Sequence, residues 1–248
     1  MSLVETRREG AVCIVTLTRD EKLNALSGEL ERDLGSALDG DEVRSSACVV
    51  LNGAGRAFSA GADITEFLER TPEAVIAYYR ETGSVYERVA ALPQPTLSAI
   101  HGYCLGGGLE LALATDFRIA DDTAVFGFPE VSLGIIPSSG GTHRLVRLVG
   151  PGRAKELFLL GGRFDAAAAR VAGLVTEVVG TGAGLERALE LARQLAELPP
   201  LAASLTKQAI DVMPEASREV GILIERLAYG MLAQTEEAKT RADQWNKS

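Results

Sequence analysis

Short apolar runs rich in β-branched residues recur along the first half of the chain, and each run stops at turn-forming residues. The runs are AVCIVTL at 11–17, ACVVLNG at 47–53 and TLSAIHG at 96–102, the last directly after Pro95. Runs of this length and composition, bounded by turn residues, are typical of buried strands. The pattern therefore predicts three strands inside a sheet.

A helical period separates the first two runs. In SGELERDLGSALDG, at 27–40, leucines recur every fourth residue, at Leu30, Leu34 and Leu38, which predicts a helix with one apolar face. Strand, helix and strand in this order form a β-α-β unit. Because strands and helical segments continue to alternate to about residue 180, the fold class is predicted to be an α/β layer structure.

The pattern becomes wholly helical after the break at Pro199–Pro200. Over 217–241, apolar residues recur at helical spacing with Arg and Glu opposite them. These apolar residues are Val220, Leu223, Ile224, Leu227 and Met231. We therefore divide the chain into an α/β core at 1–198 and a helical C-terminal region at 199–248. Its apolar face either packs on its own domain or contacts another subunit.

Composition narrows the class of protein. The 248 residues carry a formal net charge of −9, which argues against nucleic acid as a partner. No apolar run approaches the ~18–20 residues of a membrane span, so no membrane association is expected. The first ten residues, MSLVETRREG, lack the apolar region of a secretory signal and contain acidic residues that transit peptides avoid. These features predict a cytoplasmic enzyme.

The three cysteines, Cys13, Cys48 and Cys104, are odd in number, far apart and set among apolar residues. This arrangement is typical of reduced thiols in a core rather than of disulfides or a metal site. We expect no bound metal.

A candidate ligand loop lies at 58–67, in the sequence FSAGADITEF. Asp63 is placed to be the N-cap of a following helix, and Glu66 completes a capping-box pattern. The small residues Ala60, Gly61 and Ala62 precede the cap, so a ligand could approach the backbone closely and bind its N–H groups.

A second stretch, HGYCLGGGLELALATD at 101–116, repeats that arrangement, with three glycines before an apolar helix. If the two loops face each other, one N–H from each could bind a single carbonyl oxygen and stabilise the negative charge that develops there, as an oxyanion hole does. The helix contains one charge, Glu110, in its first turn. There it is either satisfied by free N–H groups or used in catalysis.

A second carboxylate, Glu130, follows Pro129 among apolar residues. Two carboxylates beside an oxyanion hole suit chemistry at the carbons next to a carbonyl, because one can handle water while the other transfers a proton to carbon.

Competing motifs fit less well. AFSAG at 57–61 nearly matches the nucleophile elbow of serine hydrolases, with Ser59 as nucleophile and His143 as base, but an alanine stands at the first glycine position. The glycines at 106–108 match neither a dinucleotide-binding motif nor a P-loop. We interpret His101 and His143 as hydrogen-bonded structural residues.

Five segments together resemble the enoyl-CoA hydratase/isomerase (crotonase) superfamily, and most closely its enoyl-CoA hydratases. The segments are DEKLNAL (20–26), AFSAGADI (57–64), PTLSAIHGYCLGGGLELALATDFRIA (95–120), FGFPEVSLGIIPSSGGTHRLVRLVG (126–150) and AGLVTEVV (172–179). Their order and spacing fit over nearly the whole chain. The resemblance implies a spiral of β-β-α units followed by helices, assembled as a homotrimer or homohexamer.

The resemblance also implies an activity and its residues. The activity is addition of water to the 2-trans double bond of an acyl-CoA thioester, as in the β-oxidation of fatty acids, without a metal or organic cofactor, since coenzyme A is part of the substrate. The backbone N–H groups of Ala60 and Gly107 would form the oxyanion hole, and residues 60–63, Ala60, Gly61, Ala62 and Asp63, would line the CoA site. Glu110 would activate water for attack on C3, and Glu130 would deliver the proton to C2.

Two alternatives remain open at this stage. Enoyl-CoA isomerases of the family commonly keep only the second glutamate, and other crotonase-fold proteins bind acyl-CoA or RNA without catalysis. The C-terminus departs from the family pattern, because EEAKTRADQWNKS, with Trp245, stands where many members have residues that hold CoA.

Overall fold

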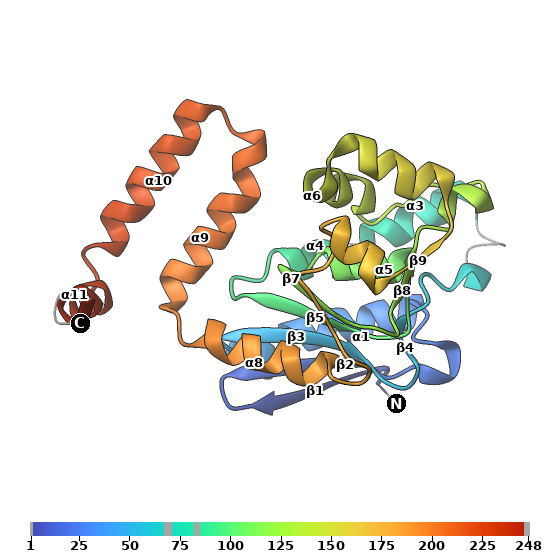
Figure 1. The fold of residues 1–248 in the computed structure, drawn as a ribbon, viewed down its shortest axis with the longest axis horizontal. Helices are drawn as coiled ribbons and strands as arrows, with labels where there is room; N and C mark the ends of the chain where they lie inside the picture. The colour runs from blue at the N-terminus through green and yellow to red at the C-terminus, as the bar shows by residue number, and fades with distance from the viewer. Residues whose placement is uncertain (1, 67–70, 82–84, 246–248) are drawn as a thin grey trace.

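Two β-sheets form the core of the computed structural model, which describes residues 2–66, 71–81 and 85–245 (Figure 1). The larger sheet has the strand order β1 (Val4–Glu9), β2 (Val12–Leu17), β3 (Cys48–Gly53), β5 (Thr96–Ile100), β7 (Phe117–Asp121) and β10 (Glu177–Val179). The smaller sheet has the order β4 (Ala57–Ser59), β6 (Tyr103–Leu105), β8 (Val125–Gly127) and β9 (Arg163–Asp165). The three strands predicted from the apolar runs are β2, β3 and β5.

Within the described part of the chain, one unit occurs three times. In the pairs β3 and β4, β5 and β6, and β7 and β8, the first strand joins the larger sheet and the second joins the smaller one. Helical segments follow each pair: η2 (Ile64–Glu66), α3 (Pro72–Glu81) and α4 (Val85–Ala90) after the first, α5 (Gly107–Leu113) after the second, and η3 (Glu130–Leu133) and α6 (Gly141–Lys155) after the third. This is the spiral of β-β-α units that the resemblance implied.

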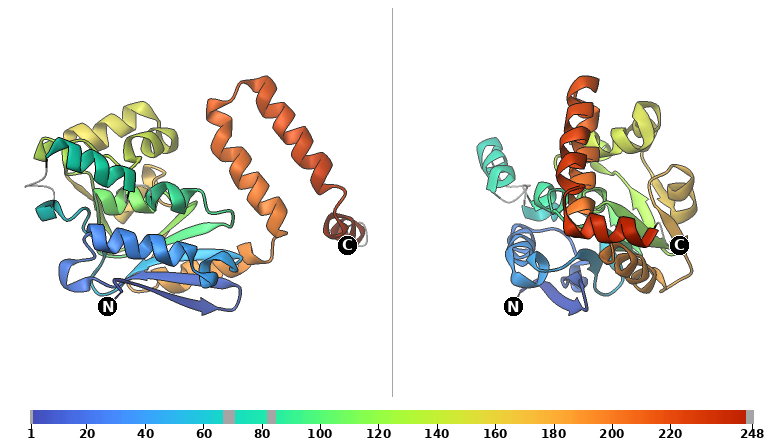
Figure 2. Two further views of the ribbon diagram at one scale, coloured as in Figure 1. Left: turned by 180° about the vertical axis from the view of Figure 1, so that it is seen from behind. Right: turned by 90° about the vertical axis from the view of Figure 1, so that its left-hand side faces the viewer.

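Helices cover both faces of the larger sheet (Figures 1 and 2). On one face, α8 (Gly184–Ala196) packs against β2, β3, β5 and β7 through Ala188, Leu189 and Ala192. On the other face lies the main apolar core, which includes side chains of α1 (Gly28–Asp39), α4 and α5. The predicted helix is α1, and its leucines at 30, 34 and 38 are buried as the period required.

The α/β part of the chain also contains short helical elements. They are η1 (Asp20–Lys22), α2 (Asp41–Arg44), the π-helix η4 (Glu156–Leu160) and α7 (Ala166–Val171). Within the described ranges, no helix is long and apolar enough to cross a lipid bilayer.

The C-terminal region extends away from the core as a helical hairpin followed by a third helix (Figures 1 and 2). Its elements are α9 (Pro200–Val212), η5 (Met213–Glu215), α10 (Arg218–Leu232) and α11 (Glu236–Trp245). The single helix expected over 217–241 is therefore two helices. Thr235 accounts for the break, because its hydroxyl accepts a hydrogen bond from the Ala238 N–H at 3.2 Å and so caps the start of α11.

Candidate active site

The two glycine-containing loops face each other, which is the condition that an oxyanion hole between them requires. Gly61 has φ of +104°, and a Cβ at this position would lie 2.8 Å from the Leu105 carbonyl oxygen and 3.6 Å from the Gly107 nitrogen. A Cβ at Gly107 would lie 3.3 Å from the Ala62 nitrogen. The backbone at Ala62 and the start of α5 therefore border one small space.

The prediction that the Ala60 N–H donates to an oxyanion is wrong. The Ala60 N–H donates to the Leu23 carbonyl at 2.9 Å, so it has no capacity left for a ligand. Within residues 2–66, 71–81 and 85–245, no acceptor is found for the N–H groups of Ala62 and Gly107. The free amides of these two loops are therefore those of Ala62 and Gly107, and Gly107 remains a candidate for the role that the resemblance implied.

The segment before α1 explains why the Ala62 amide is free. The Leu26 N–H donates to the Gly61 carbonyl, and the Asp63 N–H donates to the Leu26 carbonyl, both at 2.8 Å. These two bonds flank Ala62 in a parallel bridge. Since alternate amides along an extended segment point to opposite sides, the Ala62 N–H points away from Leu26.

The predicted capping box does not form. Ile64–Glu66 is a single 3-10 turn, in which the Asp63 carboxylate accepts from the Thr65 N–H at 3.3 Å and pairs with Arg19 at 2.8 Å. The Glu66 carboxylate instead accepts from the Gly28 N–H at 3.0 Å. Asp63 thus fixes the loop to Arg19, and Glu66 fixes it to the start of α1.

Glu110 lies in the first turn of α5 and is 3% exposed. Its Oε1 accepts from the N–H groups of Ser139 at 2.8 Å and Gly141 at 2.9 Å. Burial raises the pKa of Glu110, and these backbone hydrogen bonds lower it in part. The carboxylate is therefore held in one orientation by a loop 29 residues further along the chain.

Glu130 is the first residue of η3 and is 7% exposed. Its Oε2 is buried, and no described residue forms a hydrogen bond with it. Burial is the main reason that the pKa of Glu130 rises to about 7, and the charge of Glu110 raises it further. A Cβ at Gly106 would lie 2.8 Å from Glu130 Oε1, so Glu130 borders the same glycine turn that leads into Gly107.

The arrangement therefore combines two free amides with two buried carboxylates around one turn. Two N–H groups at a shared site stabilise negative charge that develops on an oxygen. A carboxyl group whose pKa is near 7 can donate a proton at neutral pH, and a second, oriented carboxylate can accept one. The site is suited to adding or moving protons next to a carbonyl group.

The raised pKa of Glu130 predicts a pH-dependent stability. Its pKa in the folded chain, about 7, exceeds the ordinary value of 4.5. Protonated Glu130 therefore makes its full contribution to the free energy of unfolding below pH 4.5. This contribution is lost as the pH rises through 7. We expect Glu130→Gln, which mimics the neutral acid, to unfold at higher urea concentration than the wild type at pH 8 and at a similar concentration at pH 4.5.

The expected difference at pH 8 is no more than about 3 kcal/mol in the free energy of unfolding. Urea titrations of both proteins at the two pH values measure it, with Glu5→Gln as the control, since Glu5 is exposed on β1. If wild type and Glu130→Gln differed by the same free energy of unfolding at both pH values, the raised pKa of Glu130 would be contradicted.

Ser59 and His101 have hydrogen bonds within the fold, whereas His143 is exposed and lies beyond hydrogen-bond distance of its nearest carboxylate. Ser59 is fully buried, and its hydroxyl donates to the Asn24 carbonyl at 2.8 Å, so it is not an exposed nucleophile. His101 Nε2 lies 3.1 Å from the Gly55 carbonyl, whereas His143 is exposed and lies 3.6 Å from Glu215. The three cysteines are buried free thiols, and burial raises their pKa values.

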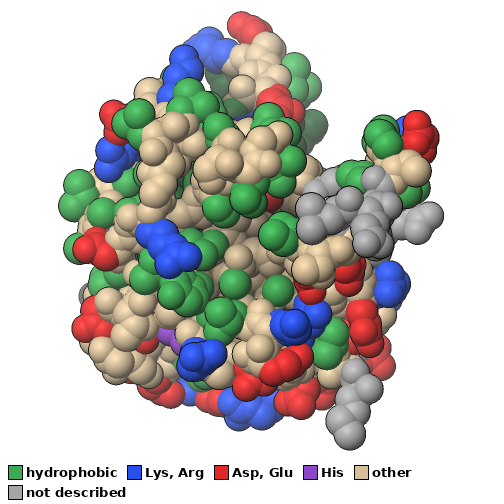
Figure 3. All heavy atoms as spheres, turned by 90° about the vertical axis from the view of Figure 1, so that its right-hand side faces the viewer, with side chains coloured by type: hydrophobic (Ala, Val, Ile, Leu, Met, Phe, Trp, Pro, Cys, Tyr) green, Lys and Arg blue, Asp and Glu red, His purple; other side chains and the backbone are tan. Residues whose placement is uncertain are grey.

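A cavity of about 460 Å³ lies beside Glu130. Apolar residues of η3, η4 and the smaller sheet dominate its lining, including Leu105, Phe128, Pro129, Val131 and Phe158. Hydrophobic side chains also gather on the face of the molecule drawn in Figure 3, and Leu160 of the cavity lining is 82% exposed. Glu130 thus lies in the chain between two residues that line this cavity, Pro129 and Val131.

Comparisons with known proteins agree on one family. Residues 7–245 match the model of the family described as enoyl-CoA hydratase/isomerase. A probable enoyl-CoA hydratase of Rhizobium meliloti is 41% identical, over 96% of this chain and 91% of that protein. The 2,3-dehydroadipyl-CoA hydratase of Escherichia coli is 38% identical, over 96% of this chain and 92% of its own.

Solved structures show the same fold. The crystal structure of an enoyl-CoA hydratase from Bacillus anthracis matches with a TM-score of 0.93 and 36% identity, covering 99% of this chain and 96% of that one. The structure of DspI from Pseudomonas aeruginosa matches with a TM-score of 0.93 at 29% identity, covering 100% of this chain and 95% of that one.

Proposed function

From the premise that the chain belongs to the enoyl-CoA hydratase/isomerase family, we propose that it adds water to the 2-trans double bond of an acyl-CoA thioester. That it is an enzyme of the enoyl-CoA hydratase class follows from its relatives at 37–41% identity. The residues, the assembly and the cytoplasmic location belong to the proposal.

In the proposed reaction, the thioester carbonyl accepts hydrogen bonds from the N–H groups of Ala62 and Gly107. Glu110 takes a proton from a water molecule as the water oxygen bonds to C3. The C2–C3 π electrons move toward the carbonyl, whose oxygen becomes negative at the two amides. Glu130 then gives its proton to C2. The proton taken up by Glu110 returns to Glu130 through solvent, so one water is added in total and both carboxyl groups regain their starting state. The proposed steps need no metal or organic cofactor.

The observation that supports this proposal best is the pair of buried carboxylates at one glycine turn. Glu110 is oriented as an acceptor by two amides, and Glu130 has a pKa near 7. Hydration needs both a base for water and an acid for C2, whereas isomerisation of 3-enoyl-CoA needs only one group to move a proton. The presence of both carboxylates favours hydration over isomerisation.

The backbone of the segment Ala60–Asp63 is suited to lie next to the CoA thioester. Gly61 leaves no room for a side chain against Leu105, and Ala60 and Ala62 keep the loop small. Close approach of the thioester to the Ala62 N–H needs this narrow backbone. Profiling activity across a panel of 2-enoyl-CoA thioesters of different chain length tests the proposal and identifies the preferred acyl group.

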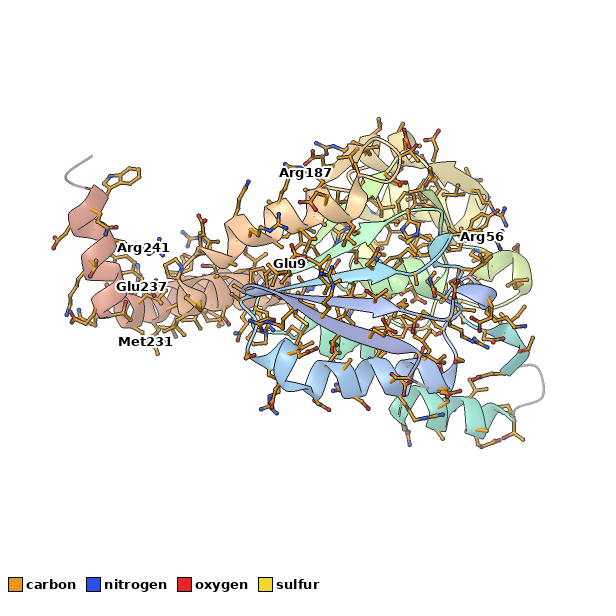
Figure 4. The ribbon with its side chains drawn as sticks, turned by 90° about the horizontal axis from the view of Figure 1, so that it is seen from below. Glu9, Arg56, Arg187, Met231, Glu237 and Arg241 are labelled. Atoms are coloured by element: carbon orange, nitrogen blue, oxygen red, sulfur yellow. The ribbon has the colours of Figure 1, made fainter. Side chains whose placement is uncertain are left out.

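We predict that the protein is a trimer or hexamer in solution. The apolar face of α10 has exposed residues, with Leu223 at 55%, Leu227 at 60% and Met231 at 64%. Met231 and the α11 residues Glu237 and Arg241 lie far from Glu9 in the core (Figure 4). An apolar face of this kind is typical of a contact between subunits, so the structure favours that alternative for the C-terminal region.

Light scattering at micromolar concentration measures the mass, which we expect to be three or six times the 26.2 kDa of the chain. Charges on the apolar face, in Leu223→Glu with Leu227→Glu, should yield smaller species, whereas Arg226→Glu on the polar face should not. A monomeric wild type would reject the prediction.

A further inference from the structure

Three buried polar side chains that take no part in the proposed reaction form one hydrogen-bonded group, which approaches the site through one of its members. They are Glu31 of α1, Tyr78 of α3 and Tyr86 of α4, with exposures of 4%, 7% and 2%. The hydroxyl of Tyr78 donates to Glu31 Oε2 at 2.5 Å, and that of Tyr86 donates to Glu31 Oε1 at 3.0 Å. One carboxylate thus fixes the direction of two phenol groups from two different helices.

Tyr86 reaches the space between the two free amides. A Cβ at Gly107 would lie 3.3 Å from the Tyr86 hydroxyl oxygen and 3.3 Å from the Ala62 nitrogen. An acyl group whose carbonyl oxygen accepts from Ala62 and Gly107 therefore lies next to Tyr86. Tyr78 has a different position, because its ring lies against Gly28 at the start of α1.

The hydrogen bond to Glu31 decides what Tyr86 can offer to a ligand. A phenol has one proton, and that proton points to Glu31. Burial and the charges of Glu31 and Glu110 raise the pKa of Tyr86 well above its ordinary value, so the phenol keeps its proton. Across the described ranges, no residue donates to the Tyr86 oxygen, which leaves a buried acceptor beside the amides.

We propose that Tyr86, held by Glu31, determines the acyl specificity of the site. It favours 2-enoyl-CoA substrates that carry a hydrogen-bond donor close to the double bond over purely aliphatic ones. The inference rests on the proposed function, because the two amides place the acyl group. A site that offers a buried acceptor discriminates against a substrate without the matching donor, because the acceptor then loses its partner.

The test compares two CoA thioesters of the same shape, 4-hydroxybut-2-enoyl-CoA and pent-2-enoyl-CoA, which differ by a hydroxyl in place of a methyl group. The ratio of their kcat/KM values is measured in wild type, Tyr86→Phe and Tyr78→Phe. Taking the ratio within each protein removes general losses of stability or active enzyme. Tyr78→Phe is the matched control, since it removes one phenol from the same carboxylate without changing the group beside Gly107.

We expect Tyr86→Phe to lower the ratio by about three- to tenfold, the range that one neutral hydrogen bond supplies, and Tyr78→Phe to leave it within twofold of the wild type. An unchanged ratio in Tyr86→Phe would overturn the inference alone, and so would an equal fall in Tyr78→Phe. Hydration of neither substrate by the wild type would overturn the proposed function and, with it, this inference.

Discussion

Replacing Glu110 by glutamine is expected to abolish hydration of crotonyl-CoA while sparing any isomerisation of 3-enoyl-CoA. The glutamine keeps an oxygen that can accept from the Ser139 and Gly141 N–H groups, as Glu110 Oε1 does at 2.8 and 2.9 Å. The fold should therefore be retained. The amide cannot take a proton from water, so hydration loses its base.

A general base commonly contributes ~10²–10⁴ in rate, and we expect a loss of that size in kcat/KM for hydration. Glu130→Gln should remove both activities, because proton transfer at C2 is common to both reactions. Both rates are measured in wild type and the two variants, with circular dichroism as the control for folding. Losses smaller than tenfold would count against the role of Glu110, and hydration at the wild-type rate would move the isomerase alternative ahead.

A valine in place of Gly107 is expected to reduce turnover by ~10²–10³-fold with a much smaller effect on folding. Its Cβ would lie 3.3 Å from the Ala62 nitrogen, and its methyl groups would occupy the space where the thioester carbonyl meets the two amides. Loss of one hydrogen-bond donor to an oxyanion typically lowers kcat by ~10²–10³-fold. Gly107→Ala should have a smaller effect, because it adds a single carbon.

The matched control is Gly152→Val in α6, where a Cβ meets no atom within 4 Å. Steady-state rates with crotonyl-CoA measure the loss of turnover, and thermal unfolding measures the loss of stability. If Gly107→Val retains normal turnover, the site formed by Ala62 and Gly107 does not bind the carbonyl, and the proposed chemistry fails.

Local patterns in the sequence predict the framework of the site well. The strands at β2, β3 and β5 and the helix α1 follow from runs and periods that depend on neighbouring residues only. The glycine runs predict two loops with accessible amides because glycine permits tight backbone approach. That these loops face each other is shown by the short distances from Gly61 and Gly107 and is not established by the glycine runs alone.

Contacts distant in the chain decide the details that the sequence did not predict. The pairing of Gly61 and Asp63 with Leu26 decides which amide of the loop is free. The sequence of the loop itself does not reveal this pairing. Glu66 leaves its predicted capping role because Gly28, 38 residues away, offers an N–H at the start of α1. Two partners of Glu31, Tyr78 and Tyr86, are 47 and 55 residues away, so no pattern among its neighbours in the sequence predicts these contacts.

The most direct test of the proposed activity is incubation of purified wild-type protein with crotonyl-CoA. The ultraviolet absorbance of the conjugated thioester is followed together with the mass of the product. We predict that the absorbance falls and that the thioester gains one water as 3-hydroxybutanoyl-CoA, whereas a Glu110→Gln, Glu130→Gln double variant produces neither change. Binding of crotonyl-CoA by the wild type with unchanged absorbance and mass would contradict the proposed function.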